Sequence, residues 1–413
     1  MLIVKKFGGS SVANAERINH VAQTIVNSYK EGNQVVVVLS AQGDTTDELI
    51  EKAKEINPNA SKREMDMLLS TGEQQSVALM AMAINKLGYP AISLNAFQCN
   101  IYSTSTYSNA RIKDIATERI NNELEKKNIV IITGFQGVNR HLDVTTLGRG
   151  GSDTSAVALA AKLGADLCEI YTDVDGVYTS DPRVVKNAKK LDEITYDEML
   201  ELASLGAKVL HNRSVELAKK YNVNLVVRSS MTDAEGTIVK EEVKVEKMLV
   251  SGVAVDKDVA RIAIVGLKDE PGVAFKIFSL LSKEKISVDI IIQSIGRSNT
   301  KDISFTVDKN DLDDAMGVLE ANQSRIGYVE LHAEKNIAKL SIVGAGMMSN
   351  PGVAAKMFES LYNEGVNINM IATSEIRVTV LINEKDGVRA MNAVHDAFRQ
   401  WQRQHNIHRF CLS

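Results

Sequence analysis

The stretch Leu2-Ile-Val-Lys-Lys-Phe-Gly-Gly-Ser-Ser11 joins an apolar run, two lysines and a glycine pair in one short segment. The apolar run Leu2–Val4 predicts a strand, and the glycine pair predicts a tight corner after it. Apolar residues then recur at helical spacing, which predicts a helix with Ser11 as its N-cap: Ile18, Val21, Ala22, Ile25 and Val26. A strand that turns directly into a helix is the repeating unit of a parallel α/β sheet.

The same alternation continues through the first 230 residues. Apolar runs of strand length lie at Leu2–Val4, Gln34–Ser40, Ala91–Leu94, Asn128–Phe135, Cys168–Val174 and Leu225–Ser230. Val35–Leu39 is apolar at every position, as expected of a strand buried on both faces. The alanine-rich run 156–163 has strong helix propensity. We therefore expect a mostly parallel sheet covered by helices on both faces.

An internal repeat follows a turn-like and charged stretch at 232–247. RIAIVGLKDEPGVAFKIF at 261–278 recurs as KLSIVGAGMMSNPGVAAKMF at 339–358. Both copies carry a Pro-Gly pair, which suits the start of a helix. Each copy predicts a strand, a turn, a helix and a further strand, and two copies are too few for a solenoid. The repeat therefore predicts a pair of small α+β modules.

Composition narrows the class of protein. The 413 residues predict two or three domains at roughly 150 residues each. A hydrophobic share of 44% and a charged share of 24% exclude collagen-like, disordered and disulfide-scaffold chains. The net charge of −4 gives no basic surplus for nucleic acid. We expect a cytoplasmic protein, because there is no membrane-length apolar run, no signal peptide, and only three scattered cysteines: Cys99, Cys168 and Cys411.

Two glycine loops suit phosphate binding, because small residues let backbone N–H groups approach phosphate oxygens. In the first loop Lys6 precedes the glycines, unlike the common P-loop, and no protein-kinase signature is present. The glycine pair can equally serve only to tighten a corner. The second loop, Thr145-Thr-Leu-Gly-Arg-Gly-Gly-Ser-Asp-Thr154, brings an arginine that can grip a carboxylate to a helix start. Asp153 can cap that helix, pair with a substrate ammonium, or order Lys6.

Two further segments remain open on sequence alone. Tyr171–Arg183 follows a strand, and its acidic residues suit ordinary turns or, with Tyr178, the base and ribose of a nucleotide. Glu73, on the approach to a helix in Ser70-Thr-Gly-Glu-Gln74, is either a surface charge or an anion that faces a substrate ammonium.

These motifs, in this order, resemble the aspartokinases of the amino-acid kinase family. The matching runs are Lys6-Phe-Gly-Gly-Ser-Ser, Ser40-Ala-Gln-Gly-Asp-Thr-Thr-Asp-Glu-Leu, Arg63-Glu-Met-Asp-Met-Leu-Leu, Thr71-Gly-Glu, Gly134-Phe-Gln-Gly, Thr146-Leu-Gly-Arg-Gly-Gly-Ser-Asp-Thr, Thr172-Asp-Val-Asp-Gly-Val-Tyr, Asp181-Pro-Arg and Val227-Arg-Ser-Ser. The repeat resembles the two ACT modules of that family. The chain departs from the family pattern near Tyr107-Ser108 and at Leu210-His-Asn-Arg.

The resemblance implies a three-layer α/β/α amino-acid kinase domain with a mostly parallel central sheet, followed by two ACT-type α+β modules of βαββαβ order. We expect the kinase domain at 1–235, a linker or start of the regulatory region at 236–255, and the modules at 256–330 and 331–413. The second module can interleave with the start of the regulatory region.

The resemblance also implies a reaction, which transfers the γ-phosphoryl group of ATP, with Mg²⁺, to the side-chain carboxylate of L-aspartate. This is the first step toward lysine, threonine and methionine. A carboxyl group with a pKa of about 4 is ionised at pH 7, so no general base is needed. Preorganised positive charge must instead let an anion approach a polyanion.

Site residues follow from the resemblance. The catalytic pair is Lys6 and Asp153, and we expect no metal cage made by the protein alone. The nucleotide side is Lys6, Phe7, Gly8, Gly9, Ser10, Thr172, Asp173, Tyr178, Asp181, Arg183 and Lys208. The substrate side is Ser40, Thr46, Glu73, Arg149, Gly150, Gly151, Ser152 and Asp153. Here Arg149 binds the α-carboxylate, Glu73 faces the α-ammonium, and Asp153 orders Lys6.

Regulation is the last implication: feedback by lysine, threonine or both through the ACT modules, in a homo-oligomer that can include a shorter regulatory subunit. The polar candidates for the effector are Asp269, Asp289, Gln293, Asn367 and Asn369, which equally suit surface and turn positions. Two alternatives remain. One is a family member acting on acetylglutamate, glutamate, carbamate or UMP, and such enzymes generally lack paired ACT modules. The other is a silent amino-acid sensor, which would be expected to lose Lys6 or Asp153. We expect neither nucleic acid nor membrane as a partner.

Overall fold

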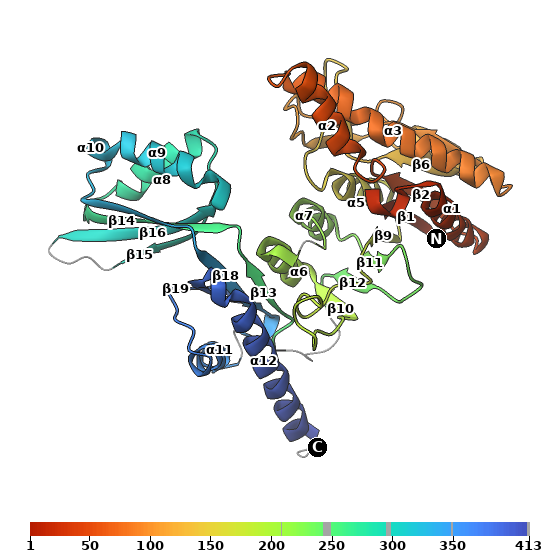
Figure 1. Ribbon diagram of the computed structural model, residues 1–413. Helices are drawn as coiled ribbons and strands as arrows, with labels where there is room; N and C mark the ends of the chain where they lie inside the picture. The colour runs from red at the N-terminus through yellow and green to blue at the C-terminus, as the bar shows by residue number, and fades with distance from the viewer. Residues whose placement is uncertain (208, 243–248, 295–298, 348–349, 411–413) are drawn as a thin grey trace. The chain divides into compact units, whose positions relative to one another are not determined.

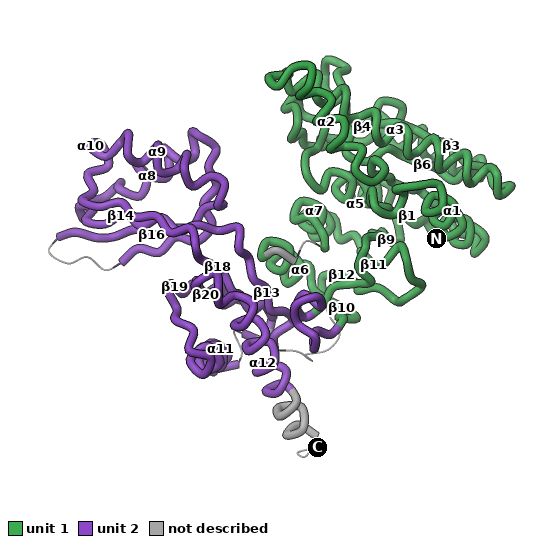
Figure 2. The backbone as a smooth tube through the Cα atoms, viewed as in Figure 1, with its two compact units in different colours: residues 1–178, 190–245 green, residues 179–189, 246–413 purple. Residues whose placement is uncertain are grey.

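The computed structural model describes residues 1–207, 209–242, 249–294, 299–347 and 350–410. The chain divides into two compact units (Figure 2). Unit 1 comprises Met1–Tyr178 and Lys190–Val245, and unit 2 comprises Thr179–Lys189 and Glu246–Ser413.

Unit 1 is built on an eight-stranded sheet in the order β10-β12-β11-β9-β1-β2-β6-β3. The strands are β1 (Leu2–Phe7), β2 (Gln34–Leu39), β3 (Ala91–Leu94), β6 (Ile129–Thr133), β9 (Leu167–Thr172), β10 (Glu193–Thr195), β11 (Leu225–Ser229) and β12 (Thr237–Lys240). Neighbours pair in parallel except β11 with β12. The mostly parallel sheet expected from the sequence is confirmed, with a strand at each of the six predicted places.

Helices cover both faces of this sheet (Figure 1). The helices of unit 1 are α1 (Ala15–Lys30), α2 (Thr45–Ile56), α3 (Lys62–Lys86), α4 (Glu118–Glu125), α5 (Gly151–Leu163), α6 (Tyr196–Leu202) and α7 (Asn212–Tyr221), of which α2 packs on α3, and α7 on α5 and α6. Helices α1 and α3 pack on the face that carries Phe7, Val35 and Val37. Side chains alternate along a strand, so the residues between these point to the opposite face, and α5 contacts β1, β2 and β9.

A smaller sheet of unit 1, in the order β5-β4-β7-β8, carries part of the site. Its strands are β4 (Ile101–Ser103), β5 (Ile112–Ile115), β7 (Gln136–Val138) and β8 (Val144–Thr146). Strand β8 forms the first residues of the second glycine loop and ends at Thr146, and α3 packs against it.

Two local expectations were wrong. Helix α1 is capped by Asn14, whose side chain accepts a hydrogen bond from the Arg17 backbone, because the chain first makes the 3-10 turn η1 (Gly9–Val12), which contains Ser11. Ser70–Gln74 lies in the middle of α3 rather than at its approach, because this helix runs for 25 residues.

Unit 2 contains two four-stranded antiparallel sheets, β15-β16-β14-β17 and β13-β18-β20-β19. The first is built from β14 (Val259–Lys268), α8 (Val273–Lys283), β15 (Val288–Gln293), β16 (Thr300–Asp308), α9 (Leu312–Ala321), α10 (Gln323–Ile326) and β17 (Glu330–Glu334). The second is built from β13 (Gly252–Asp256), β18 (Ile337–Val343), α11 (Val353–Asn363), β19 (Met370–Thr373), β20 (Arg377–Asn383) and α12 (Gly387–Phe410). The paired α+β modules predicted from the repeat are confirmed.

The repeat sets the same corner in both modules. Gly272 and Gly352 are the N-caps of α8 and α11, with φ of +92° and +100°, a left-handed conformation that suits glycine. The second sheet also takes a strand from before the first module, because β13 pairs with β18.

The segment Thr179–Lys189 belongs to unit 2, although Tyr178 and Lys190 on either side of it form a β-bridge in unit 1. Within unit 2 the Thr179 carbonyl accepts a hydrogen bond from the Val253 backbone at 2.8 Å. Val185 is buried in the core of the second sheet. The expected kinase domain 1–235 includes this segment, so the chain leaves unit 1 and returns to it.

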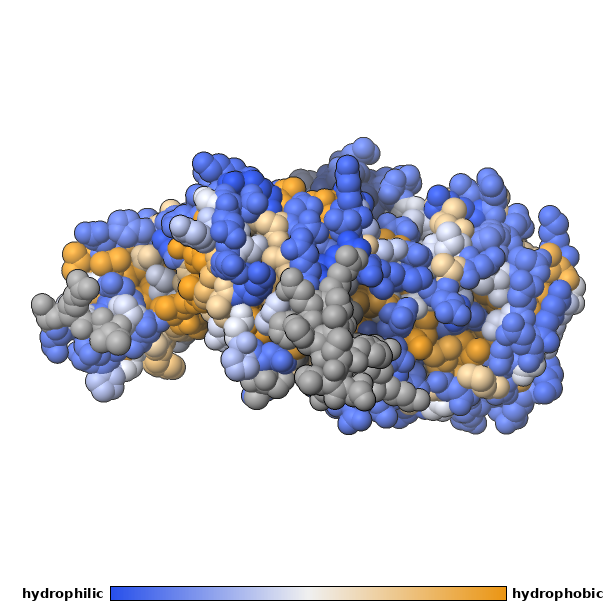
Figure 3. All heavy atoms as spheres, turned by 90° about the horizontal axis from the view of Figure 1, so that it is seen from below, coloured by the Kyte–Doolittle hydropathy of each residue, from blue (hydrophilic) through white to orange (hydrophobic). Residues whose placement is uncertain are grey.

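The surface is mostly hydrophilic with scattered apolar patches on the face shown in Figure 3. Among the helices that the structure describes, none is both long enough and apolar enough to cross a membrane.

Candidate active site

Lys6 and Asp153 form an ion pair at the carboxyl edge of the large sheet. Lys6 is the penultimate residue of β1, and Asp153 lies in the first turn of α5. Lys6 Nζ lies 2.7 Å from Asp153 Oδ1, and both side chains are largely buried. Ligands of open parallel sheets bind outside this edge, so the pair stands where chemistry is expected in such a fold.

The first glycine loop packs tightly beside Lys6. A Cβ on Gly9 would lie 2.7 Å from the Ala41 carbonyl oxygen, so the close approach of the two main chains requires glycine here. A Cβ on Gly8 would lie 3.5 Å from Lys6 Nζ. Phe7 is fully buried and stacks on Tyr171, so its side chain is part of the core, while Ser10 is exposed.

The second glycine loop delivers the start of α5 to the same edge. Gly150 is the N-cap of α5 with φ of +66°, and no side chain caps the helix. A Cβ on Gly150 would lie 2.2 Å from the His211 ring, and one on Gly151 would lie 2.8 Å from the Phe135 ring. An uncapped helix start presents backbone N–H groups and partial positive charge, which suits an anion. Ser152, in the first turn, is buried.

Arg149 lies just before this helix and is exposed. In the part of the chain that the structure describes, its guanidinium makes no hydrogen bond or ion pair. A planar cation without an internal partner is available to hold a carboxylate in a bidentate pair.

Glu73 is a buried carboxyl group on α3, 3% exposed. Its Oε1 accepts a hydrogen bond from the Ala41 backbone at 3.2 Å, and its Oε2 accepts one from Gln136 Nε2 at 3.4 Å. Burial raises the pKa of Glu73 to about 7, because desolvation penalises the charged form more than these bonds stabilise it. Because Glu73 is buried, the surface-charge interpretation of this residue is wrong. A cation bound beside Glu73 would favour its ionised form and so lower its pKa again.

Ser40 and Thr46 lie at the two ends of the connection between β2 and α2, which contains Ala41. Ser40 follows β2, and its backbone N–H donates to the Phe7 carbonyl at 3.2 Å. Thr46 lies in the first turn of α2. Both residues are partly exposed, and Ala41 between them contacts Gly9 on one side and Glu73 on the other.

The residues expected on the nucleotide side divide between the two units. In unit 1, Thr172 ends β9 next to β1, and its hydroxyl donates to the Asp173 carboxylate at 3.0 Å. The Tyr178 hydroxyl donates to Asp175 at 2.8 Å, which raises the pKa of Tyr178.

Asp181 and Arg183 lie in unit 2 and pair with each other at 2.9 Å. The Arg183 guanidinium lowers the pKa of Asp181. Lys208, also expected on the nucleotide side, lies outside the described residues.

The five effector candidates lie in unit 2, in three places. Asp269 pairs with Lys301 at 2.9 Å after β14. Asp289, on β15 with Gln293, reaches Lys339 of the second module at 2.7 Å. Asn367 donates to Asn369 at 3.3 Å just before β19.

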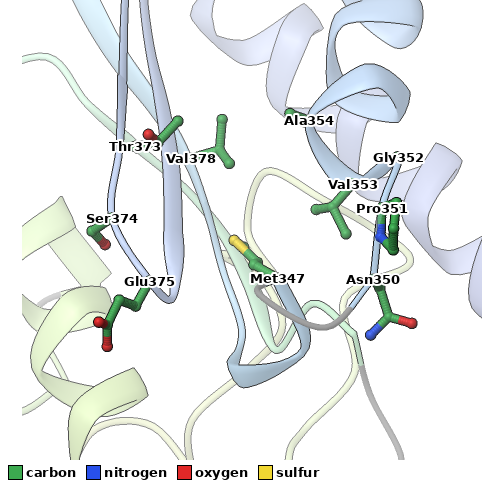
Figure 4. A pocket seen from close by; sticks show the side chains of 10 residues that line it. All are labelled: Met347, Asn350, Pro351, Gly352, Val353, Ala354, Thr373, Ser374, Glu375 and Val378. Atoms are coloured by element: carbon green, nitrogen blue, oxygen red, sulfur yellow. The ribbon is translucent and has the colours of Figure 1, made fainter.

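A cavity of about 260 Å³ lies in the second module between the start of α11 and the β19–β20 hairpin. Figure 4 shows Met347 between hairpin residues Thr373 and Val378 and helix-start residues such as Val353. Its polar lining includes Asn350, Ser374 and Glu375. None of the five effector candidates lines this cavity.

Three residues near the site were not selected from the sequence. Asp66 on α3 is fully buried. Gln136 donates to the Ser70 carbonyl at 2.6 Å and to Glu73. Arg213 on α7 donates to the Leu147 carbonyl at 2.5 Å. Each lies in a sequence run quoted above, but only the contacts in the structure distinguish these three residues from the others in those runs.

Known proteins are similar to this chain over nearly its whole length. The model of the amino acid kinase family matches residues 1–229, and the ACT domain matches residues 262–323 and 340–398. A protein of Bacillus sp. strain MGA3 named aspartokinase is 52% identical over 398 residues, which are 96% of this chain and 97% of that protein.

Solved structures agree. The structure of E. coli aspartokinase III with aspartate and ADP, in the R-state, superposes with a TM-score of 0.81 at 25% identity, covering 96% of this chain and 99% of that one. The same enzyme with lysine and aspartate, in the T-state, gives a TM-score of 0.76 at 26% identity, with the same two coverages.

Proposed function

The chain belongs to the aspartokinases of the amino acid kinase family, and we propose that it phosphorylates the side-chain carboxylate of L-aspartate with ATP at the edge of unit 1 that carries Lys6 and Asp153. The observation that carries this placement is the Lys6–Asp153 pair, 2.7 Å long, at the uncapped start of α5 beside two glycine loops. We keep 1–235 as the proposed kinase domain, 236–255 as the linker, and 256–330 and 331–413 as the proposed ACT modules.

The reaction requires positive charge from the protein rather than a general base. A carboxylate oxygen of aspartate forms a bond to the γ-phosphorus as the bond to the bridging oxygen breaks, and ADP leaves. Lys6 neutralises charge on the transferred group, and Asp153 holds the Lys6 ammonium in place. The Gly151 N–H already donates to the Gly148 carbonyl at 3.0 Å, so the N–H groups of Ser152 and Asp153 add the partial positive charge of a helix start.

The substrate is held by the two charged groups on its α-carbon, which leaves the side-chain carboxylate free to react. Arg149 takes the α-carboxylate, and Glu73 takes the α-ammonium in its ionised form. Ser40 and Thr46 supply hydroxyl donors on the near side, and Gly150 lets the main chain of the loop turn sharply. Two clamps on one amino acid explain selectivity for a substrate that carries both charges.

The nucleotide side combines the backbone of Phe7–Ser10 with Thr172, Asp173 and Tyr178 of unit 1. Asp181, Arg183 and Lys208 remain proposed members of this side. Among the described residues there is no group of three or more His, Cys, Asp or Glu side chains able to hold a metal. Mg²⁺ would bind mainly to substrate phosphates and water, with one or two carboxylates. When bound, it would neutralise phosphate charge.

We further propose feedback by lysine, threonine or both through unit 2, as the E. coli enzyme solved with lysine suggests. Asp269, Asp289, Gln293, Asn367 and Asn369 are the candidate effector residues, and the cavity at Glu375 is a further place for a small amino acid. We propose a homo-oligomer, with or without a shorter regulatory subunit. A cytoplasmic location is supported by the free, buried Cys99 and Cys168.

One assay tests this function. Acyl-phosphate formation from ATP is trapped with hydroxylamine for aspartate, glutamate, acetylglutamate and succinate, with and without lysine and threonine. Turnover with aspartate alone, reduced by an effector, is expected. Absence of turnover with every acid, in protein that still binds lysine or threonine, would show a silent sensor instead.

A further inference from the structure

Asp66 is a fully buried carboxylate whose hydrogen bonds all go to segments outside its own helix. It accepts from the Ser108 backbone at 3.0 and 2.9 Å and from the Ser108 hydroxyl at 3.3 Å. It also accepts from the Thr146 backbone and the Thr146 hydroxyl, both at 2.8 Å. A buried charge is costly unless it is fully hydrogen-bonded, so this carboxylate fastens α3 to two other segments.

Both segments support the loop that carries Arg149. Thr146 ends β8, and Arg149 follows three residues later. The Ser108 carbonyl would lie 3.1 Å from a Cβ on Gly148, and the Ala110 backbone donates to the Thr146 carbonyl at 2.9 Å. The base of the Arg149 loop is therefore held by groups that Asp66 binds directly.

The backbone conformation of Ser108 is unfavourable by itself and is stabilised by the hydrogen bonds to Asp66. Ser108 has φ of +65°, in the left-handed region that is unfavourable for a residue other than glycine. Three of the hydrogen bonds to Asp66 come from this residue. Asp66 thus stabilises an unfavourable turn that places the Ser108 carbonyl beside Gly148.

Asp66 and Glu73 share one rigid helix. They are seven residues apart on α3, which is about two turns, so both face the same side of the helix about 10 Å apart along its axis. Both are buried on that side. A shift of α3 relative to β8 would therefore move Glu73 relative to Arg149.

We infer that Asp66 is a positioning residue that sets the spacing between Glu73 and Arg149, and so governs affinity for an amino acid that carries both an ammonium and an α-carboxylate. This inference rests on the proposed roles of those two residues. Asp66 touches neither reactant in this account. It acts through the helix on one side and the Arg149 loop on the other.

The opposite side of the loop has its own support. Arg213 donates to the Leu147 carbonyl at 2.5 Å and to the Ala110 carbonyl at 3.0 Å. Loss of the Asp66 carboxylate should therefore loosen the loop without detaching it. That makes a conservative substitution informative about position rather than about folding.

The test is Asp66→Asn in the full chain, with KM for aspartate, KM for ATP and kcat measured separately. An amide presents N–H groups to backbone donors that need an acceptor, so the spacing is disturbed at constant volume. We expect KM for aspartate to rise roughly tenfold or more, since small misplacements of binding groups are costly. KM for ATP should stay within about twofold, because the nucleotide side does not depend on this contact.

Inhibition by succinate separates positioning from general damage. Succinate lacks the ammonium and so uses only one clamp, and its inhibition constant should change far less than KM for aspartate. Asp313→Asn is the control. Asp313 pairs with Lys335 at 2.8 Å on the exposed surface of unit 2 and makes no contact with α3 or β8 among the described residues. It should leave KM for aspartate unchanged.

Equal rises of both KM values, an unchanged KM for aspartate in folded Asp66→Asn, or an equal change for succinate would overturn the inference. If Asp66→Asn does not fold, Thr146→Val removes one of the hydrogen bonds, and a rise of about threefold in KM for aspartate alone is expected. Lack of aspartate turnover in the unmodified protein would instead reject the proposed function.

Discussion

Lys6 Nζ and Asp153 Oδ1 lie 2.7 Å apart, although Lys6 is near the end of the first strand and Asp153 is in the first turn of a helix far along the chain. The parallel sheet brings them together, because the C-terminal end of β1 and the N-terminal end of α5 meet at one edge. Asp153 holds the Lys6 ammonium beside the first turn of α5, where backbone N–H groups also carry partial positive charge. Such preorganised charge is what transfer between two anions requires.

Lys6→Ala should lower kcat by two or more orders of magnitude, since it removes one preorganised charge from the transition state. Steady-state turnover with aspartate measures the effect, and the thermal unfolding midpoint checks the fold. Lys52→Ala, on the exposed side of α2, is the control and should retain full activity. Near-normal turnover in Lys6→Ala would remove this residue from the reaction.

Arg149→Ala should act on the substrate rather than on the nucleotide. KM for aspartate should rise at least tenfold, because a bidentate, charge-assisted pair is lost, while KM for ATP changes little. Separate titrations of the two substrates measure this. Arg140→Ala, an exposed arginine on the neighbouring hairpin, is the control. A rise only in KM for ATP would show that the assignment is wrong.

The pH profile should report Glu73. Burial raises its pKa to about 7 in the free protein, so below pH 7 most molecules carry a neutral Glu73 that cannot pair with an ammonium. We expect kcat/KM for aspartate to rise as pH increases through about 7 and then level off. Glu73→Gln should lower the plateau and abolish this rise. A rise that persists in Glu73→Gln would assign it to another group.

The fold was largely predictable, because each layer rests on local patterns. The buried strand Val35–Leu39 reads as an unbroken apolar run, and the Pro-Gly pairs mark two equivalent helix starts. The segment Thr179–Lys189 was not predicted to lie in unit 2, because its packing there depends on which of the two cores buries Val185. Periodicity carries no information about such a choice.

The site was predictable in its glycine loops but not in its supports. Glycine is required at positions 9 and 150 because neighbouring groups approach the main chain closely there, and both glycines belong to motifs that the sequence shows. The supporting contacts join residues distant in sequence, and they are made by Asp66, Gln136 and Arg213. The sequence alone does not show which aspartate of a helix is buried. Glu73 illustrates the same limit, because its burial, and hence its raised pKa, follows from the packing of α3.

The two adjacent lysines of β1 point to opposite faces of the sheet, because side chains alternate along a strand. We therefore expect the ion pair of Lys5 to contribute to stability and Lys6 to contribute to turnover. Lys5 is 4% exposed and pairs with buried Glu169 on β9, which also contacts Arg228. Glu169→Gln leaves the Lys5 charge buried without its partner, which should cost roughly 3 kcal/mol. Unfolding in denaturant and the thermal midpoint measure this loss.

Replacing both partners separates structure from chemistry. Lys5→Met combined with Glu169→Leu removes both charges at similar volume, and such replacements are often neutral or stabilising. The double variant should therefore recover much of the stability lost in Glu169→Gln and keep turnover, since Lys6 is untouched. If the double variant is stable but inactive, Lys5 takes part in the reaction, and the division of labour between the two lysines is wrong.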